Sequence, residues 1–199
     1  VDPAPDETGV ETDVWGNPRH RFAVLAPHRR LTVRAVSRVA LSPRFQGLDP
    51  AAGPAWEDVA ARLRYVARAP FEPAVEFTLP SPFVPRLEEL RAYARPSFPP
   101  GRPVAEGALD LMHRVHADFR YDGDATQVDT PLAQAFAQKR GVCQDFAHAM
   151  AGALRMLGLP ARYVSGYLLT TPAPGQPALV GADASHAWVQ AWVPGTPGV

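Results

Sequence analysis

A chain of 199 residues is long enough to bury a sizeable core, and its 20 basic and 20 acidic residues balance. Because no block of like charge stands out, the sequence excludes a nucleic-acid groove and a polybasic membrane patch, and the most apolar run is too short for a transmembrane helix. A single cysteine excludes an internal disulfide, so nothing demands an oxidising compartment, and we expect a cytoplasmic protein.

The first 42 residues are predicted to form antiparallel strands. The turn signal GNP separates VETDVW from RHRFAVLA. A further half-buried strand is expected over residues 29–41, where apolar and polar side chains alternate. Three strands make a poor domain on their own. We therefore expect them to pack on the later part of the chain or to begin inside a larger sheet.

Residues 43–103 are rich in proline and are predicted to connect this β-rich part to a catalytic part. Short helices are expected near residues 56–67 and 84–94, the first because its apolar side chains recur at helical spacing. After this connector, an apolar stripe over residues 104–119 indicates a longer helix. Thr130 followed by Pro131 is typical of an N-cap and a first helical position, which predicts a short helix over 130–139.

The last part of the chain is predicted to hold one helix and two strands. The helix is expected to run from about Cys143 to Leu157, where Gly158 and Pro160 end it. The segments ARYVSGYLL and ASHAWVQAWV are the predicted strands, and a loop joins them.

Cys143 stands where a glycine gives way to this helix, in the run RGVCQDFAHAM. Three roles are open to it: a small buried hydrophobe, a metal ligand or a nucleophile. At a helix start, free backbone N–H groups and the positive end of the helix dipole favour the reactive thiolate. The same N–H groups can stabilise an oxyanion when a carbonyl is attacked. A nucleophile at this position still needs a base.

His186 is the candidate base, because it lies on a predicted strand between the small residues Ser185 and Ala187. Two tryptophans, Trp188 and Trp192, share its face and could wall a water-poor cleft. A helix that supplies a cysteine and a strand that supplies a histidine are the papain-type arrangement of roles.

Nearby residues of the same chemical types have simpler interpretations. His148 lies over the far side of a helical turn from Cys143, and we expect it to pack or to hydrogen-bond. Asp145 is an acid in the first turn of the helix, and a structural contact is about as plausible for it as a catalytic one.

A metal site has little support in the sequence. His113 and His116 have a spacing that suits a metal, but no further ligand follows in register, so a solvated helix face is favoured. A zinc site built from Cys143, His148 and His186 would lack the paired spacing of known sites.

The run GVCQDFAHAMAGALRMLGLPARYVSGYL, followed by ASHAWVQAWVPG, closely resembles the core of the bacterial transglutaminase-like superfamily of cysteine enzymes, over about residues 103–195. The segment DVWGNPRHRFAVLAPHRRLTVRAVSRVAL resembles the β-rich N-terminal domain that precedes this core. The resemblance implies an α+β protein whose papain/transglutaminase-like core packs the nucleophile helix on an antiparallel sheet, preceded by a partial antiparallel β region. We expect the N-terminal domain and connector over 1–80 and the core over 81–199.

The resemblance also implies that Cys143 is the nucleophile and that His186 is the base and later the acid, without a metal or an organic cofactor. A peptide or protein substrate would be attacked at an amide carbonyl, an amine would leave, and water or another amine would resolve the thioester. The family's third catalytic residue, an Asp after the histidine strand, has no match before Val199. We therefore expect a fragment with an unprotected sheet edge that is open to self-association.

Three functions fit these residues, in decreasing order of support. The first is thiol-dependent hydrolysis of peptide or isopeptide bonds, as in a cysteine protease. The second is a catalytically inactive binding or assembly module, and the third is a metal-binding or redox role for Cys143. The sequence does not distinguish hydrolysis from transamidation, because pocket shape decides whether water or an amine reaches the thioester.

Overall fold

The computed structural model describes residues 1–40, 47–168, 175 and 185–195, and the chain divides into two compact units, Val1–Gln46 and Gly47–Val199. The first unit holds the antiparallel pair β1 (Glu7–Thr12) and β2 (Pro18–Ala23), joined through the predicted turn. The carboxylate of Asp13 accepts the backbone N–H groups of Trp15 and Asn17 and so closes this turn. The prediction of a hairpin here is confirmed.

The half-buried strand predicted over residues 29–41 is wrong for the residues that the structure describes. Residues 31–40 are exposed and form only an isolated antiparallel bridge, between Thr32 and Asp2. Residue 41 lies outside the described part. Alternation determines which face of a strand would be buried, but a strand also needs a neighbouring backbone to pair with. The described residues supply that neighbour only at Thr32.

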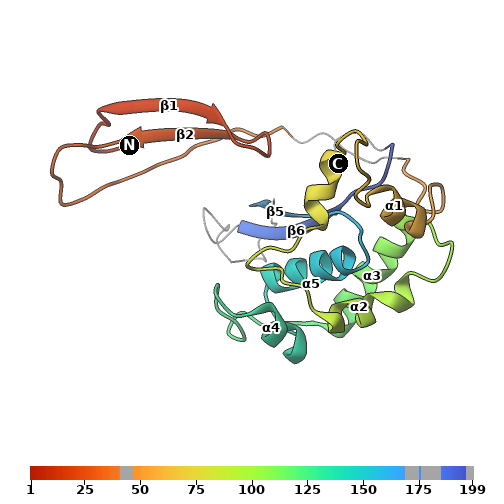
Figure 1. The fold of residues 1–199 in the computed structure, drawn as a ribbon. Helices are drawn as coiled ribbons and strands as arrows, with labels where there is room; N and C mark the ends of the chain where they lie inside the picture. The colour runs from red at the N-terminus through yellow and green to blue at the C-terminus, as the bar shows by residue number, and fades with distance from the viewer. Residues whose placement is uncertain (41–46, 169–174, 176–184, 196–199) are drawn as a thin grey trace. The chain divides into compact units, whose positions relative to one another are not determined.

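The second unit contains all the helices of the described residues and the core (Figure 1). Its helical elements are α1 (Trp56–Arg62), η1 (Pro73–Thr78), α2 (Glu88–Ala94), η2 (Arg95–Ser97), α3 (Val104–Asp118), α4 (Leu132–Gln138) and α5 (Cys143–Met156). Its strands are β3 (Arg120–Tyr121), β4 (Arg140–Gly141), β5 (Ala161–Tyr167) and β6 (Ser185–Ala191). Residues 47–80, which the sequence grouped with the N-terminal part, lie in this unit, where Val59, Leu63 and Ala74 join the core.

Several predicted helices are shorter than expected, for local reasons. Helix α2 begins at Glu88 because Val84 pairs with Ser81 in a turn instead. Helix α4 begins at Leu132 with Pro131 at the N-cap position, so the prediction of Thr130 as N-cap is wrong. The hydroxyl of Thr130 accepts the backbone N–H of Gln127 and caps that preceding turn.

Helix α5 is the centre of the second unit and lies between the β5–β6 hairpin and helices α2 and α3 (Figure 1). One of its faces carries small residues, which let α2 approach closely: a side chain on Gly152 would collide with Leu90. Strands β5 and β6 pair antiparallel from Ala161↔Ala191 to Tyr167↔Ser185. The predicted α+β core, with this helix packed on an antiparallel sheet, is confirmed.

Candidate active site

Cys143 is the first residue of α5 and is half-buried. The chain reaches it through β4, which pairs in parallel with β3, so that Tyr121 lies opposite Gly141. A backbone hydrogen bond from Asp122 to the carbonyl of Gly141 extends this pairing. The start of α5 is therefore tied to a segment about twenty residues earlier in the chain.

The buried side chain of Asp145 stabilises the same helix start through hydrogen bonds. Its side chain is 4% exposed, and its Oδ2 accepts the backbone N–H of Val142 at 2.8 Å and the hydroxyl of Thr126 at 2.6 Å. A carboxylate in the first turn that accepts the N-cap N–H forms half of a capping box. Of the two roles left open for Asp145, the structure shows the structural one.

Two backbone donors stay available beside the cysteine. The N–H groups of Asp145 and Phe146 bond to the carbonyl of Val142. Among the described residues, none accepts a hydrogen bond from the N–H of Cys143 or of Gln144. Two free N–H groups at the positive end of a 14-residue helix can stabilise an oxyanion.

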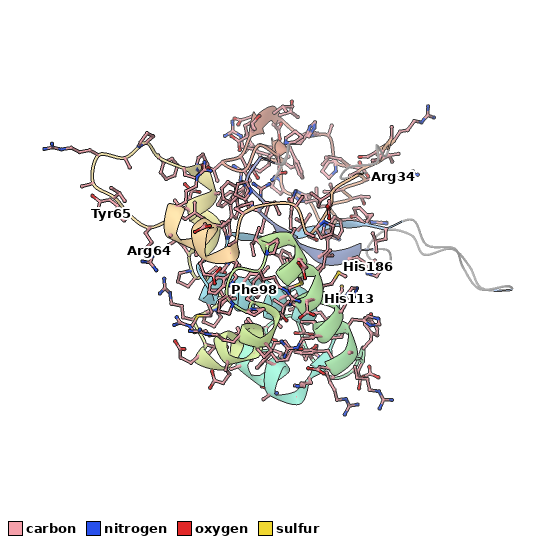
Figure 2. The ribbon with its side chains drawn as sticks, turned by 90° about the vertical axis from the view of Figure 1, so that its right-hand side faces the viewer. Arg34, Arg64, Tyr65, Phe98, His113 and His186 are labelled. Carbon is pink, nitrogen blue, oxygen red and sulfur yellow. The ribbon has the colours of Figure 1, made fainter. Side chains whose placement is uncertain are left out.

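The fold brings the start of β6, and with it His186, to the same end of α5 as Cys143. Helix α5 rises about 20 Å over its length, and β5 runs back by a similar distance, because a strand rises about 3.3 Å per residue. His186 pairs with Gly166, near the end of β5. Figure 1 shows α5 and β6 beginning on the same side of the unit, and Figure 2 labels His186 on its strand.

Alternation along β6 determines the face on which His186 lies. Val189 and Ala191 pack against the core that includes α5, so alternation places His186 and Trp188 on the opposite face of β6, and no described contact joins the His186 ring to Cys143. The ring of Trp188 covers Gly166, where a side chain would collide with it. The hydrogen bonds of the described residues include none between Cys143 and His186, and such contacts are often loose before substrate binds.

The other histidines lie elsewhere. The ring of His148 packs between Phe83, at 5.8 Å between centroids, and Tyr163, at 4.9 Å, so the prediction that it packs is confirmed. Burial lowers the pKa of His148, which favours the neutral imidazole. His113 and His116 are exposed on α3, and Figure 2 shows His113 on that helix. In the described part of the chain, no three metal-binding side chains are grouped to hold an ion.

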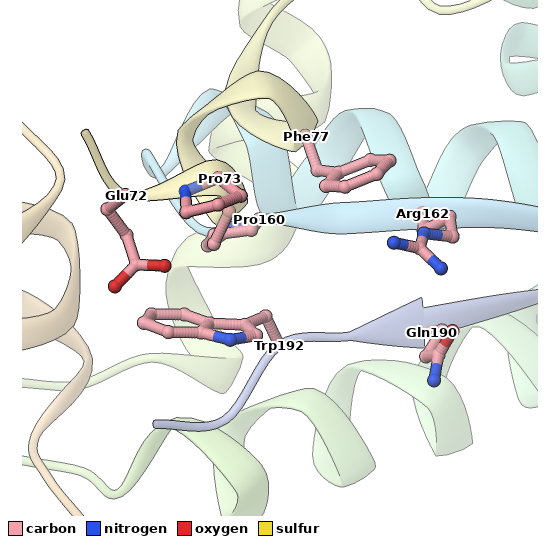
Figure 3. A pocket seen from close by; sticks show the side chains of 8 residues that line it. Glu72, Pro73, Phe77, Pro160, Arg162, Gln190 and Trp192 are labelled. Atoms are coloured by element: carbon pink, nitrogen blue, oxygen red, sulfur yellow. The ribbon is translucent and has the colours of Figure 1, made fainter. Parts of the chain in front are cut away.

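A cavity of about 210 Å³ lies at the other end of the β5–β6 hairpin (Figure 3). Trp192 and Pro160 border it, and a backbone hydrogen bond joins these two residues. The Arg162 guanidinium lies 4.4 Å from the ring centroid of Phe77 on its wall. Because this cavity is beside the beginning of β5 and the end of β6, the start of α5 lies at the opposite end of the hairpin.

Sequence reasoning did not find the contacts that shape this site. Thr126 has no sequence signal that links it to Asp145, because a loop residue can meet any helix start. Gln144 donates from its side chain to the carbonyl of Val128 at 3.0 Å, a contact that no local pattern signals. No helix among the described residues has both the length and the apolar character to cross a bilayer.

The fold defines an α+β protein in which a helix beginning with cysteine packs on a hairpin that carries a histidine. Residues 91–197 match the Transglutaminase-like superfamily, and residues 1–40 match the Bacterial transglutaminase-like N-terminal region. The chain therefore belongs to the transglutaminase-like superfamily.

Known relatives extend beyond the length of this chain. An uncharacterized protein of Mycobacterium tuberculosis is 42% identical over 201 residues, which cover 100% of this chain and 62% of the relative. A protein-glutamine gamma-glutamyltransferase of Pseudomonas aeruginosa is 32% identical over 114 residues, 47% of this chain and 17% of that protein. The crystal structure of a candidate cysteine protease from Cytophaga hutchinsonii has the same fold, with a TM-score of 0.52 at 24% identity, over 67% of this chain and 43% of that one.

Proposed function

We propose that the protein is a thiol enzyme that cleaves amide bonds by acyl transfer, with Cys143 as the nucleophile and His186 as the base. The observation that carries this proposal is the start of α5. There a half-buried cysteine has beside it two backbone N–H groups without an acceptor among the described residues, and a buried aspartate below it. The free N–H groups of such a helix start can stabilise the oxyanion that attack by the cysteine sulfur creates.

The proposed reaction balances through a thioester. His186 takes the proton of the Cys143 thiol, and the thiolate sulfur forms a bond to the amide carbon while the carbonyl π electrons move to oxygen. The N–H groups of Cys143 and Gln144 hydrogen-bond that oxyanion. The C–N bond then breaks, and the amine leaves with the proton from His186. Water, deprotonated by His186, cleaves the thioester and restores the thiol.

Hydrolysis of peptide or isopeptide bonds is the outcome that we propose first. Transfer of the acyl group to a second amine is the alternative, and it is favoured by the relationship to the P. aeruginosa protein, which is named for glutamine γ-glutamyl transfer. The proposal uses no metal or organic cofactor. It requires a reduced thiol, which fits a cytoplasmic location.

An inactive binding module on the same fold is the second candidate. It predicts a Cys143 whose reactivity does not depend on His186. Alkylation by iodoacetamide between about pH 4 and 9, followed by intact mass, distinguishes the two candidates without a known substrate. His186→Ala is the variant, and His116→Ala, which removes an exposed histidine from α3, is the matched control.

For an enzyme, we expect rapid labelling well below pH 8, slowed in His186→Ala and unchanged in His116→Ala. Labelling with an ordinary thiol pKa of about 8.5 that is the same in all three proteins would contradict the assignment of the pair.

A further inference from the structure

A cavity of about 310 Å³ is lined in part by the residue that directly follows the candidate nucleophile. Gln144, the residue after Cys143, forms one part of its wall, and the exposed Val128 forms its rim. The side chain of Gln144 is held against the Val128 carbonyl at 3.0 Å. This contact fixes a part of the wall that is one residue from Cys143 in the sequence.

Aromatic rings form the middle of this cavity. The imidazole of His148 lies nearly parallel to the ring of Phe83, with an interplanar angle of 16°, and contacts Tyr163 on its other side. Phe83 is 56% exposed although it stacks on His148, so much of its ring faces solvent rather than protein. Aromatic faces that are partly open to solvent gain most when another ring covers them.

The backbone holds Phe83 in this position. Phe83 lies in a turn that two hydrogen bonds between Ser81 and Val84 close, each of 3.0 Å. Val84 is buried and packs against α5 at Gly152. The wall is therefore preformed, which reduces the ordering cost of binding.

Charged groups near the cavity relate it to Cys143 and disfavour a positively charged ligand. Burial and, after it, the negative charge of the Cys143 thiolate raise the pKa of Tyr163, so the charge of Cys143 reaches this wall. Arg155 lines the far part of the cavity and donates to the carbonyls of Ala161 and Leu79. Among the described residues, no carboxylate forms an ion pair with Arg155. Its positive charge therefore disfavours a second cation.

We propose that this cavity is the side-chain subsite for the acyl donor, and that it takes an aromatic side chain of a peptide in preference to a basic one. The inference rests on the proposed function, because it requires Cys143 to attack the peptide that the cavity holds. A closed cavity of about 150 Å³ is enough for a benzene ring, so an open one of about 310 Å³ accommodates a phenyl side chain.

Two chloromethyl ketones test the subsite on the 199-residue chain without a known substrate: tosyl-phenylalanine and tosyl-lysine chloromethyl ketone. In each reaction the Cys143 thiolate displaces chloride, so that a C–S bond forms and a C–Cl bond breaks. Intact mass gives the rate of alkylation, and Cys143→Ser subtracts reaction at other groups. We expect the phenylalanine reagent to react at least about tenfold faster, after each rate is normalised to that of the same reagent with a small free thiol.

Phe83→Ala should reduce this preference several-fold, whereas Phe71→Ala should leave it unchanged. Phe71 is the matched control because it is 68% exposed and does not line the cavity. Val128→Glu is a second variant at an exposed position, and its negative charge at the rim should accelerate the lysine reagent selectively.

The outcomes of these experiments distinguish a failure of the proposed subsite from a failure of the proposed function. Equal rates for the two reagents, or a preference that Phe83→Ala and Val128→Glu both leave intact, would overturn the subsite while a His186-dependent reaction of Cys143 with iodoacetamide still supports the enzyme. If iodoacetamide labelling is independent of His186, the proposed function fails, and the subsite fails with it.

Discussion

The hydroxyl of Thr126 donates a hydrogen bond of 2.6 Å to the carboxylate of Asp145, which also accepts the backbone N–H of Val142. This buried contact joins the loop after β3 to the first turn of α5. It fixes the helix end at which Cys143 lies, so the geometry of the candidate nucleophile depends on a side chain that does not itself react.

Replacing Asp145 by alanine should destabilise the protein by about 2–4 kcal/mol, because two buried donors lose a charged acceptor. Urea unfolding measures this change, and iodoacetamide labelling should show that Cys143 has become less reactive. Asp129→Ala is the control, since Asp129 is exposed in the same part of the chain. Equal unfolding free energies for the two variants would contradict the role of Asp145.

Gly141→Ala should also destabilise the start of α5. Gly141 has a φ of 159°, and a side chain on it would collide with the carboxylate of Asp145. Backbone strain of this kind costs about 1–3 kcal/mol before the collision is relieved. Gly123→Ala is the matched control because its new methyl group would meet open space. Thermal or urea unfolding that ranks the two variants equally would show that residue 141 tolerates a side chain.

The stability of the protein should depend on pH through His148. Burial lowers its pKa below the ordinary value of 6.5, the charge of Arg155 lowers it further, and Asp145 opposes this. Between the folded and the unfolded pKa, the unfolded chain binds more protons. Stability is therefore full above about pH 6.5 and declines as the pH falls through the folded pKa. Urea unfolding at about pH 7.5 and 5 should show a smaller decline for His148→Gln than for the wild type, and an unchanged one for His116→Gln.

Strand β6 should mediate self-association at high concentration. Trp188 is 40% exposed on this strand, so its apolar ring can pack against a second copy of the chain. Sedimentation equilibrium should show a concentration-dependent dimer that Trp188→Lys weakens. Tyr65→Lys, at an exposed aromatic residue that Figure 2 labels, should leave it unchanged. A strictly monomeric wild-type chain would contradict this prediction.

Local signals predicted the elements of the second unit well, because periodicity and helix-ending residues act within a few positions. The helix from Cys143 ends at Met156, and Gly158 follows with a φ of 80°, as the glycine signal indicated. The same reasoning failed over residues 31–40, where strand alternation is present but a pairing partner is needed. Local reasoning also assigned the helix cap to Thr130 wrongly, because the Thr130 hydroxyl accepts a hydrogen bond within the preceding turn instead.

The sequence by itself determined the family, the α+β class and the two residues proposed for chemistry, because a cysteine at a helix start and a histidine on a strand are local features. Only the tertiary structure decided which side chains surround them. Thr126 hydrogen-bonds to Asp145 at the helix start, and His148 stacks between Phe83 and Tyr163. These residues are separated by 15 to 80 positions in the chain. Their contacts depend on how helices and strands pack, which no local pattern encodes.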